Sequence, residues 1–350
     1  MKSIFTSVIV SFTLLSSCVN SQDVIYSKGS SEFNSFPSSY NVTTSVLAQL
    51  GDAYVRDILL VDSKLVLVNL KESNAQVLSV LNLNTKVVTE LGYKRGFGSN
   101  EVAVPIQSGL LPNGNIYLFD PTQKKLVKGI INAENKWKPL SSQRIKDGHY
   151  SFRMINDSTA YGFGSSHTLG KIQYLNVNTG IEKDLFGEFL KVPKGFKPGS
   201  WKHAHEGFLF LKPDRTMVVL AHRYFDKIEL FNIQAKTSTS LSGPKNIALS
   251  ATPFSTQGMD IIMTNESTVF AYTNGFVTDK FIFAVFSNKP EGKPGANIGK
   301  DVFVFSWDGK PIAHITLDLE VSALAVTKDN KTLYGFSPSK QAIVTAKVPF

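Results

Sequence analysis

Two histidines separated by a single residue, His203 and His205, form the closest histidine pair in the sequence of 350 residues. In a β-strand their side chains would share one face, and both imidazole rings could then ligate one metal ion. His222 is the candidate for a third ligand, provided that an adjacent strand brings it close. Histidines beside Trp201 and Lys202 more often pack or lie on the surface. The sequence therefore favours packing and leaves a metal site as the alternative.

The segment that leads to this pair, residues 191–202, has the composition of a binding loop. It combines four lysines with two aromatic residues, which would offer cations to an anion and ring faces to a sugar or an acyl chain. The side chains that we single out for binding are Lys194, Lys197 and Trp201. Two prolines and two glycines predict an irregular loop between strands, and loops on rigid scaffolds often carry recognition. A solvated insertion without a ligand is the alternative.

Catalytic motifs are weak. The chain has no Gly-x-Ser-x-Gly nucleophile elbow. Asp308-Gly309 follows Ser306-Trp307 in an order that does not fit the aspartate box of sialidases, and it makes a good hairpin turn. Gly96-Phe97-Gly98 lacks the following helix that a phosphate-binding loop needs. We therefore expect a non-catalytic binding or scaffold protein with no cofactor. A hydrolase or lactonase with a divalent metal in a central channel is the alternative.

The single cysteine, Cys18, lies where a bacterial lipoprotein needs it. Lys2 precedes an apolar run over residues 4–15, and two serines lead directly to Cys18. A positive start, a short apolar core and small residues before a cut site are typical of a secretory signal, and about a dozen apolar residues are too few to cross a bilayer. The segment resembles a lipobox. We expect residues 1–17 to be a signal peptide and Cys18 to carry the lipid that anchors the protein to the membrane.

The residues after Cys18 predict a tether and a location. Residues 18–40 are rich in Ser, Gly and Asn, so we expect a flexible segment there and a folded domain over residues 41–350. Lipoproteins of the Bacteroidetes type that reach the cell surface often carry an acidic run after the cysteine, and this chain has none. By that resemblance, we expect an exported protein on the periplasmic face of the outer membrane.

The charge of the chain bears on its partners. The formal net charge is +9, and a basic chain suggests nucleic acid in a cytoplasmic protein. Export and the scatter of the lysines among acidic residues argue against that, so we expect no nucleic-acid partner. An anionic envelope component, a glycan or another envelope protein fits better, and a merely solvated surface is the simpler alternative.

Repeated hairpins dominate the chain from residue 55 onward. Two short apolar runs joined by a polar turn occur six times, with turns spaced 43 to 65 residues apart. The hairpins cover residues 58–68, 109–119, 152–163, 207–220, 269–286 and 323–336. A second hairpin turn follows in each of the first five units, so each unit can hold four strands. The sixth unit has room for three strands only.

The missing strand of the sixth unit has a candidate in residues 42–50, which precede the first complete unit. Pairing of that N-terminal strand with the last unit would close a ring and hide two sheet edges. The sequence thus predicts an all-β fold, a six-bladed β-propeller whose ring is closed by an N-terminal strand in the last blade.

Side chains near the start of a blade can point into the central funnel of such a ring. Arg95, Arg153 and Arg223 lie near predicted blade starts and are our candidates for contacts with an anionic ligand. Asp157-Ser158-Thr159 matches a short acceptor pattern for O-glycosylation in exported proteins of the Bacteroidetes type. A plain hairpin turn explains the same residues more simply.

Five segments match a known family in their order along the mature chain. They are residues 57–62, 96–101, 111–117, 222–228, and 321–326 with 333–335. Together with Cys18 they resemble the TolB-like six-bladed β-propeller lipoproteins of Bacteroidetes. In that family the loop at residues 96–101 usually reads Gly-x-Gly-Pro-x-Glu, and Ser99 stands here in place of the proline. The resemblance implies the fold and the location, and it implies no general enzymatic activity.

Overall fold

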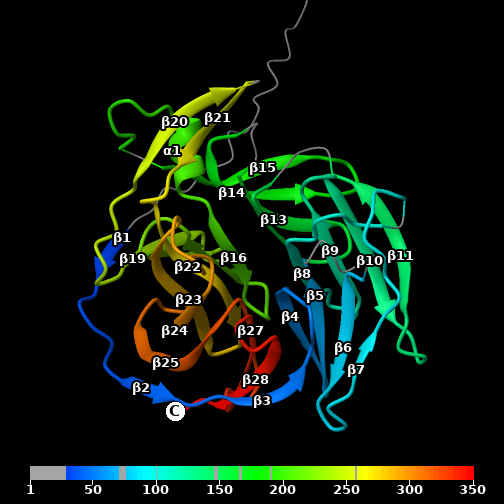
Figure 1. The fold of residues 1–350 in the computed structure, drawn as a ribbon. Coiled ribbons are helices and arrows are strands. Elements are labelled where there is room, and N and C mark those ends of the chain that lie inside the picture. The colour runs from blue at the N-terminus through cyan, green and yellow to red at the C-terminus, as the bar shows by residue number, and fades with distance from the viewer. Residues whose placement is uncertain are drawn as a thin grey trace, which may run out of the picture.

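The computed structural model describes residues 29–70, 76–99, 101–145, 149–164, 168–189, 191–256 and 258–350. Six β-sheets form a ring around a central channel, which confirms the predicted six-bladed propeller (Figure 1). Each blade runs from an innermost strand at the channel to an outermost strand at the rim. The innermost strands of neighbouring blades contact one another around the ring.

The six predicted hairpins are the two innermost strands of the six blades. Blade 1 contains β4 (Val55–Val61), β5 (Lys64–Asn69), β6 (Leu78–Asn82) and β7 (Val88–Glu90). Blade 2 contains β8 (Gln107–Leu110), β9 (Ile116–Asp120), β10 (Lys125–Ile131) and β11 (Trp137–Arg144). Blade 3 contains β12 (Ser151–Met154), β13 (Thr159–Phe163), β14 (Gly170–Asn176) and β15 (Glu182–Glu188).

The second half of the ring repeats this order. Blade 4 contains β16 (Gly207–Leu211), β17 (Met217–His222), β18 (Lys227–Asn232) and β19 (Thr237–Ser242). Blade 5 contains β22 (Val269–Val277), β23 (Phe281–Pro290), β24 (Gly299–Ser306) and β25 (Pro311–Val321). Blade 6 contains β26 (Ala323–Val326), β27 (Thr332–Ser337) and β28 (Ala342–Lys347).

The inner strands form because the blades pack face to face. Every residue of β9 is buried, since one face packs on blade 1 and the other on blade 3. Phe119 of β9 stacks on Phe152 of β12 in the next blade, with ring centroids 4.8 Å apart. The outermost strand β11 is exposed over most of its length, and its sequence is correspondingly polar. Strands that are buried on both faces read as continuous apolar runs, which is why the hairpins were visible in the sequence.

The ring closes as predicted. Strand β3 (Ser45–Gln49) lies within the predicted segment 42–50 and pairs antiparallel with β28, as the outermost strand of blade 6. The register places Gln49 opposite Ala342 and Ser45 opposite Thr345. The N-terminal and C-terminal parts of the chain therefore share one sheet, and the edge of β28 is covered.

The predicted tether differs from the structure over its second half. Strand β1 (Gly29–Glu32) pairs parallel with β19 of blade 4, and strand β2 (Ser39–Val42) pairs parallel with β25 of blade 5. Between them, Phe33 is only 9% exposed and packs edge-on against Phe305. Residues 29–40 thus form a strap along the outer edges of blades 4 and 5, and they are not a free tether. Residues 1–28, including Cys18, lie outside the described residues.

Two additional elements, one inserted before blade 4 and one before blade 5, form a small cap on the ring. Helix α1 (Pro198–Ala204) precedes blade 4, within the region expected to be an irregular loop. A hairpin of β20 (Ala251–Thr256) and β21 (Met259–Thr264) precedes blade 5 and packs on α1 (Figure 1). Neither element was predicted. No helix among the described residues is long and apolar enough to cross a membrane.

The turn that contains Ser158 joins β12 to β13, as the hairpin pattern predicted. The Asn156 side chain accepts hydrogen bonds from the backbone N–H of Ser158 (2.9 Å) and from its hydroxyl (3.1 Å). These contacts account for the turn, and glycosylation of Ser158 stays a prediction.

Candidate functional site

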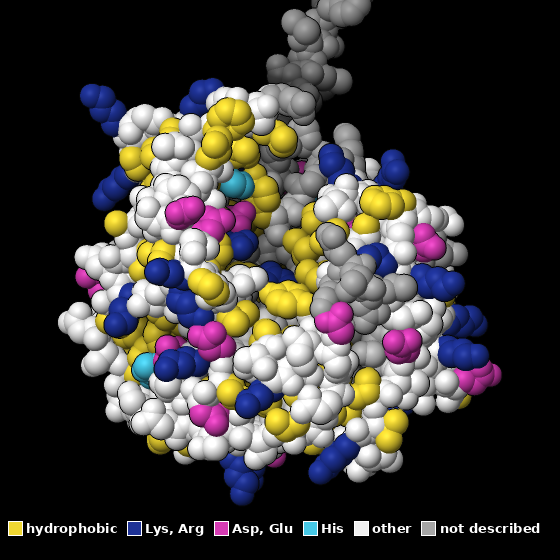
Figure 2. Space-filling view, in the orientation of Figure 1, with side chains coloured by type: hydrophobic (Ala, Val, Ile, Leu, Met, Phe, Trp, Pro, Cys, Tyr) yellow, Lys and Arg dark blue, Asp and Glu magenta, His cyan; other side chains and the backbone are white. Residues whose placement is uncertain are grey.

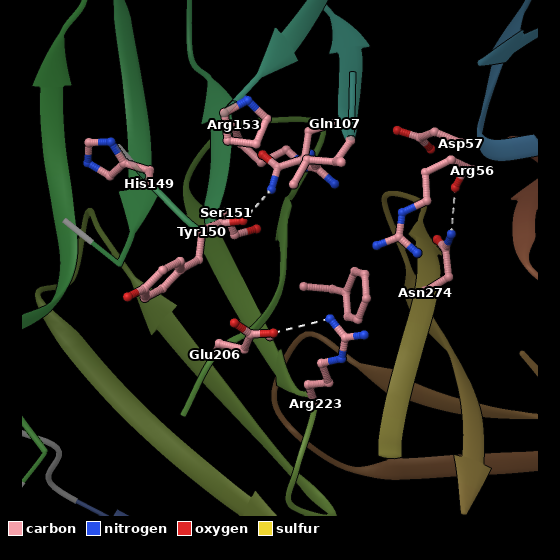
Figure 3. A pocket seen from close by; sticks show the side chains of 14 residues that line it. Arg56, Asp57, Gln107, His149, Tyr150, Ser151, Arg153, Glu206, Arg223 and Asn274 are labelled. Carbon is pink, nitrogen blue, oxygen red and sulfur yellow. Dashed lines mark hydrogen bonds and ion pairs between the residues drawn. The ribbon is translucent and has the colours of Figure 1, made fainter. Parts of the chain in front are cut away.

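A cavity of about 190 Å³ lies at one end of the central channel, where the innermost strands begin. Three arginines from three blades line it: Arg56 of β4, Arg153 of β12, and Arg223, which follows β17 (Figure 3). Two carboxylates, Asp57 and Glu206, line the same cavity. The site therefore gathers three permanent cations and two acids around one small space.

Arg223 is the paired cation of the three. Its Nη1 lies 3.1 Å from Oε1 of Glu206, an ion pair that Figure 3 shows across the cavity. The same oxygen accepts a hydrogen bond from the Tyr224 hydroxyl at 3.4 Å, and Oε2 lies 3.5 Å from Nε2 of His203. The Arg223 guanidinium also lies over the Phe270 ring, 4.6 Å from its centroid. These contacts hold Arg223 in place, and the negative charge of Glu206 is balanced by Arg223.

Arg56 has no such partner. Among the described residues, its guanidinium makes no hydrogen bond and no ion pair, and it lies over the Phe208 ring at 5.0 Å. Burial is the largest influence on the pKa of Arg56 and lowers it; the positive charges of Arg223 and Arg153 also lower this pKa, whereas Tyr54 and Asp57 raise it. Arg56 is thus a cation held close to two like charges in a partly desolvated space, and such an arrangement favours an incoming anion.

Arg153 stands between this cavity and a second one. Its Nη1 donates to the Phe152 carbonyl at 3.2 Å, and its guanidinium lies 5.7 Å from the centroid of the Phe210 ring. Asp57 lies at the same level and is held by Ser108: Oδ2 accepts from the Ser108 hydroxyl (2.7 Å) and N–H (3.1 Å). Among the described residues Asp57 makes no ion pair with the three arginines, although its negative charge raises the pKa of Arg56.

The second cavity, of about 420 Å³, fills the opposite end of the channel. Arg153 and Asp57 line both cavities, so they mark the boundary between a cationic chamber and a largely apolar one. The apolar walls come from the innermost strands and their hairpin turns, and include Leu60, Leu110 and Phe276.

Tyr150 adds a neutral donor to the cationic chamber. Burial and the nearby charge of Glu206 raise the pKa of its hydroxyl to about 12, so the group stays protonated at neutral pH. A ring of guanidinium groups with a phenol hydroxyl can bind an oxyanion through charge-assisted hydrogen bonds.

The structure places Arg153 and Arg223 together at the predicted funnel, but not Arg95. The Arg95 guanidinium donates to the backbone carbonyls of Asn69 (2.7 Å) and Ala103. It therefore braces the loop after blade 1 and does not line the channel cavity. Arg56, which sequence reasoning missed, takes its place. It lies two residues before the first predicted hairpin, so the rule that selected Arg153 could also have found it.

The three other predicted binding residues lie in the cap. Lys197 pairs with Asp260 of β21 (Nζ–Oδ1, 3.1 Å), and Trp201 packs edge-on against Phe196. Lys194 is exposed in the loop before α1. None of the three lines the cationic chamber.

The histidine pair does not share a face, because His203 lies in α1 and not in a strand. Its Nδ1 accepts from the Ile262 N–H at 3.0 Å, whereas His205 stacks on Phe189 and places its Nδ1 3.2 Å from Nδ1 of His222. His222 thus lies beside His205, whereas His203 contacts the backbone of β21. Burial lowers the pKa of His205 and of His222 well below 6.5, so both rings are neutral.

A metal centre needs several ligands around one point. Among the described residues, no group of three or more His, Cys, Asp or Glu side chains could hold a metal ion. Of the predicted pair, His203 contacts the backbone of β21 and His205 contacts the ring of His222. This geometry gives no support to the metal alternative at these two residues.

Six four-stranded blades around a channel, with arginines at one mouth, define a six-bladed β-propeller with a cationic central pocket. The sequence match extends over residues 35–329 and is to the TolB-like 6-blade propeller-like family. The chain belongs to this family. No curated protein sequence matches it significantly.

Solved structures share the fold at low sequence identity. A "Putative exported protein" from Bacteroides fragilis is 12% identical with a TM-score of 0.53, and the match covers 93% of this chain and 98% of that one. A member of the DUF4221 family from Bacteroides vulgatus is 11% identical with a TM-score of 0.51, covering 87% and 97%. At these identities the likeness is one of fold.

Proposed function

We propose that this protein is an exported, lipid-anchored binding module of the cell envelope, and that its channel binds a small anion. The anion carries a phosphate or carboxylate group, which enters the chamber lined by Arg56, Arg153 and Arg223. The single observation that carries the proposal is the guanidinium of Arg56, which has no hydrogen-bond or ion-pair partner among the described residues and lies beside two other cations in that chamber. Placing like charges together costs free energy in the empty protein, and an anion would recover it.

The chamber also has the geometry that recognition requires. Its cations project from three blades, so a bound oxyanion would be held from several directions by elements of one rigid ring. Guanidinium groups bind phosphate and carboxylate through paired N–H donors, which gives direction as well as charge. Tyr150 supplies a further donor that stays neutral.

Titration calorimetry with inorganic phosphate, and separately with acetate, tests the binding proposal. We expect saturable binding that is weakened about 100-fold or more when Arg56, Arg153 and Arg223 are all replaced by Gln, because each charged hydrogen bond contributes about 1.5–3 kcal/mol. The matched control replaces three exposed lysines, Lys138→Gln, Lys236→Gln and Lys300→Gln, which changes the net charge equally. Equal affinity of the two triple variants would overturn the proposal.

The location rests on the N-terminal sequence. Lys2, the apolar run over residues 4–15 and the serines before Cys18 support export and lipidation, and the missing acidic run favours the periplasmic face of the outer membrane. A structural neighbour described as an exported protein agrees with this. Mass spectrometry of the protein isolated from cells should find an N-terminal diacylated Cys18, and Cys18→Ala should release the protein from the membrane fraction. An unmodified N-terminus at Met1 would contradict the location.

A further inference from the structure

The β20–β21 hairpin exposes an apolar face that the ring does not use. Three of its large hydrophobic side chains are exposed to a high degree: Phe254 (44%), Met259 (44%) and Met263 (51%). Figure 2 shows hydrophobic side chains gathered over this hairpin, at the edge of the molecule. Single exposed hydrophobic residues are ordinary, but a cluster on one protruding element marks an interaction surface.

The strand register explains why these residues share a face. Phe254 lies opposite Ile261, Thr256 opposite Met259, and Thr252 opposite Met263. Residues that lie opposite each other in an antiparallel pair point to the same side, and alternate residues along a strand do likewise. We call the face formed by Phe254, Met259, Ile261 and Met263 the outer face of the hairpin. None of these side chains carries a charge.

The opposite face of the hairpin is fixed to α1. Asp260 forms an ion pair with Lys197 and accepts a hydrogen bond from the Ser255 hydroxyl (2.6 Å). The Ile262 N–H donates to His203, and the Ile262 side chain packs in a buried cluster with Ala204. The polar and buried residues of the hairpin thus face the helix, and the apolar outer face is turned away from it.

The start of the folded chain lies near this cap. Ser30 of β1 and Trp201 of α1 line the same cavity, together with Lys191 from the loop before α1. Cys18 precedes Gly29 by eleven positions, so no more than about 40 Å of chain can separate the two residues. A lipid on Cys18 would therefore hold the cap close to the membrane surface.

The cap also carries basic residues. Lys191 and Lys194 are exposed in the loop that enters α1, and Lys191 lines the cavity that Ser30 and Trp201 line. A cap with an apolar face and exposed lysines fits the boundary between anionic headgroups and acyl chains.

We propose that the outer face of the β20–β21 hairpin inserts into the lipid leaflet that holds Cys18 and fixes the orientation of the ring on the membrane. The proposal takes the lipid anchor from the proposed function, but it does not depend on the anion site. The partner is a lipid surface with anionic headgroups. A second copy of the chain is the competing occupant.

The experiment tethers residues 18–350, which include every strand of the ring, to vesicles through the thiol of Cys18 and a maleimide lipid. Cys18 is the only cysteine, so the attachment is unique. The vesicles contain phosphatidylethanolamine and phosphatidylglycerol with brominated acyl chains, which quench nearby tryptophan. The three native tryptophans, Trp137, Trp201 and Trp307, are replaced by Phe in every variant. In that background Phe254→Trp and Met263→Trp report from the outer face. Val87→Trp, at a site that is 57% exposed beside β7 of blade 1, is the matched control.

We expect both outer-face probes to be quenched about twofold or more relative to the control, with emission shifted to the blue, because insertion brings them within the acyl region. Quenching of both probes no greater than that of Val87→Trp would overturn the proposal. Sedimentation without vesicles tests the competing occupant: a dimer that shifts the Phe254→Trp emission without lipid would show that another copy covers the face, and would overturn the proposal as well. Since the tether is chemical, a failure of lipidation in cells would leave this result unaffected.

Discussion

Exchanging Arg56 and Arg95 for glutamine separates binding from stability, because the two arginines have opposite surroundings. Arg95 donates to two backbone carbonyls, of Asn69 and Ala103, and braces the loop after blade 1. Arg56 makes no hydrogen bond or ion pair among the described residues and lies near two other cations. Arg95→Gln should therefore act on folding, and Arg56→Gln should act on the affinity for anions.

The magnitudes follow from these contacts. Arg95→Gln removes two charge-assisted hydrogen bonds, which at about 1.5 kcal/mol each lowers the free energy of unfolding by about 3 kcal/mol. Arg56→Gln loses one cation–π contact with Phe208, about 0.5–1 kcal/mol, and gains the relief of repulsion from Arg153 and Arg223. Its net effect on the free energy of unfolding should stay within about 1 kcal/mol. Its affinity for phosphate should fall about 10- to 100-fold, the equivalent of one or two charged hydrogen bonds.

Urea unfolding measures the first quantity and titration calorimetry with inorganic phosphate the second. Lys138→Gln, a change of one exposed cation, serves as the control for net charge in both assays. The reasoning is refuted if Arg56→Gln destabilises the fold as much as Arg95→Gln does. It is also refuted if Arg95→Gln weakens phosphate binding as much as Arg56→Gln does.

Three other perturbations probe the chamber, the buried histidines and the closure of the ring. Glu206→Gln removes the ion pair of Arg223, so the affinity for phosphate should rise about 10-fold by calorimetry. The pKa of Tyr150 should fall from about 12 in an ultraviolet titration, because the charge of Glu206 helps to raise it. An unchanged affinity would show that Glu206 does not compete with the anion for Arg223. The buried pair His205 and His222 is neutral in the folded protein, so the free energy of unfolding should be highest above about pH 6.5 and should fall below that pH, by about 1.4 kcal/mol per histidine at pH 5.5. Urea unfolding of the double variant His205→Gln/His222→Gln should show a smaller decrease between these pH values. An equal decrease would refute the conclusion that the two buried rings are neutral. Deleting residues 29–50 removes β1, β2 and β3 and exposes the edges of β19, β25 and β28, so size-exclusion chromatography should show oligomers or aggregates. A stable monomer would disprove the importance of these N-terminal strands for closing the ring.

The ring could be predicted from the sequence because its physics is local and repeated. Strands such as β5 and β9 are buried on both faces, so they read as apolar runs, and the polar turns between them recur at regular intervals. The closing strand β3 could be predicted because the sixth unit has room for three strands only and one strand precedes the first complete unit.

The cap and the strap could not be predicted in this way. Helix α1 has seven residues and begins with Pro198 and Gly199, which is too short for a helical period to show. Strand β20 is exposed and rich in Thr, Ser and Pro, so it lacks the apolar run that marked the other strands. Strand β1 has no buried residue and is positioned by backbone pairing with β19, which leaves no trace in its side chains.

The candidate site was predicted in part, and side-chain direction set the limit. Arg153 and Arg223 were selected because they lie near blade starts, and both line the channel cavity. Arg95 satisfied the same criterion of position, yet its side chain turns to two backbone carbonyls, which depends on the path of a loop. Which arginine reaches the channel is decided by tertiary contacts, and these leave no local pattern in the sequence.

Diffraction from crystals soaked in selenate would show directly whether the channel binds an oxyanion, because selenate has the shape and charge of a tetrahedral oxyanion and selenium gives an anomalous signal. We expect an anomalous peak in the channel within hydrogen-bond distance of Arg56, Arg153 and Arg223, and its loss in crystals of Arg56→Gln. An empty channel, with peaks only beside exposed lysines, would contradict anion binding at this site.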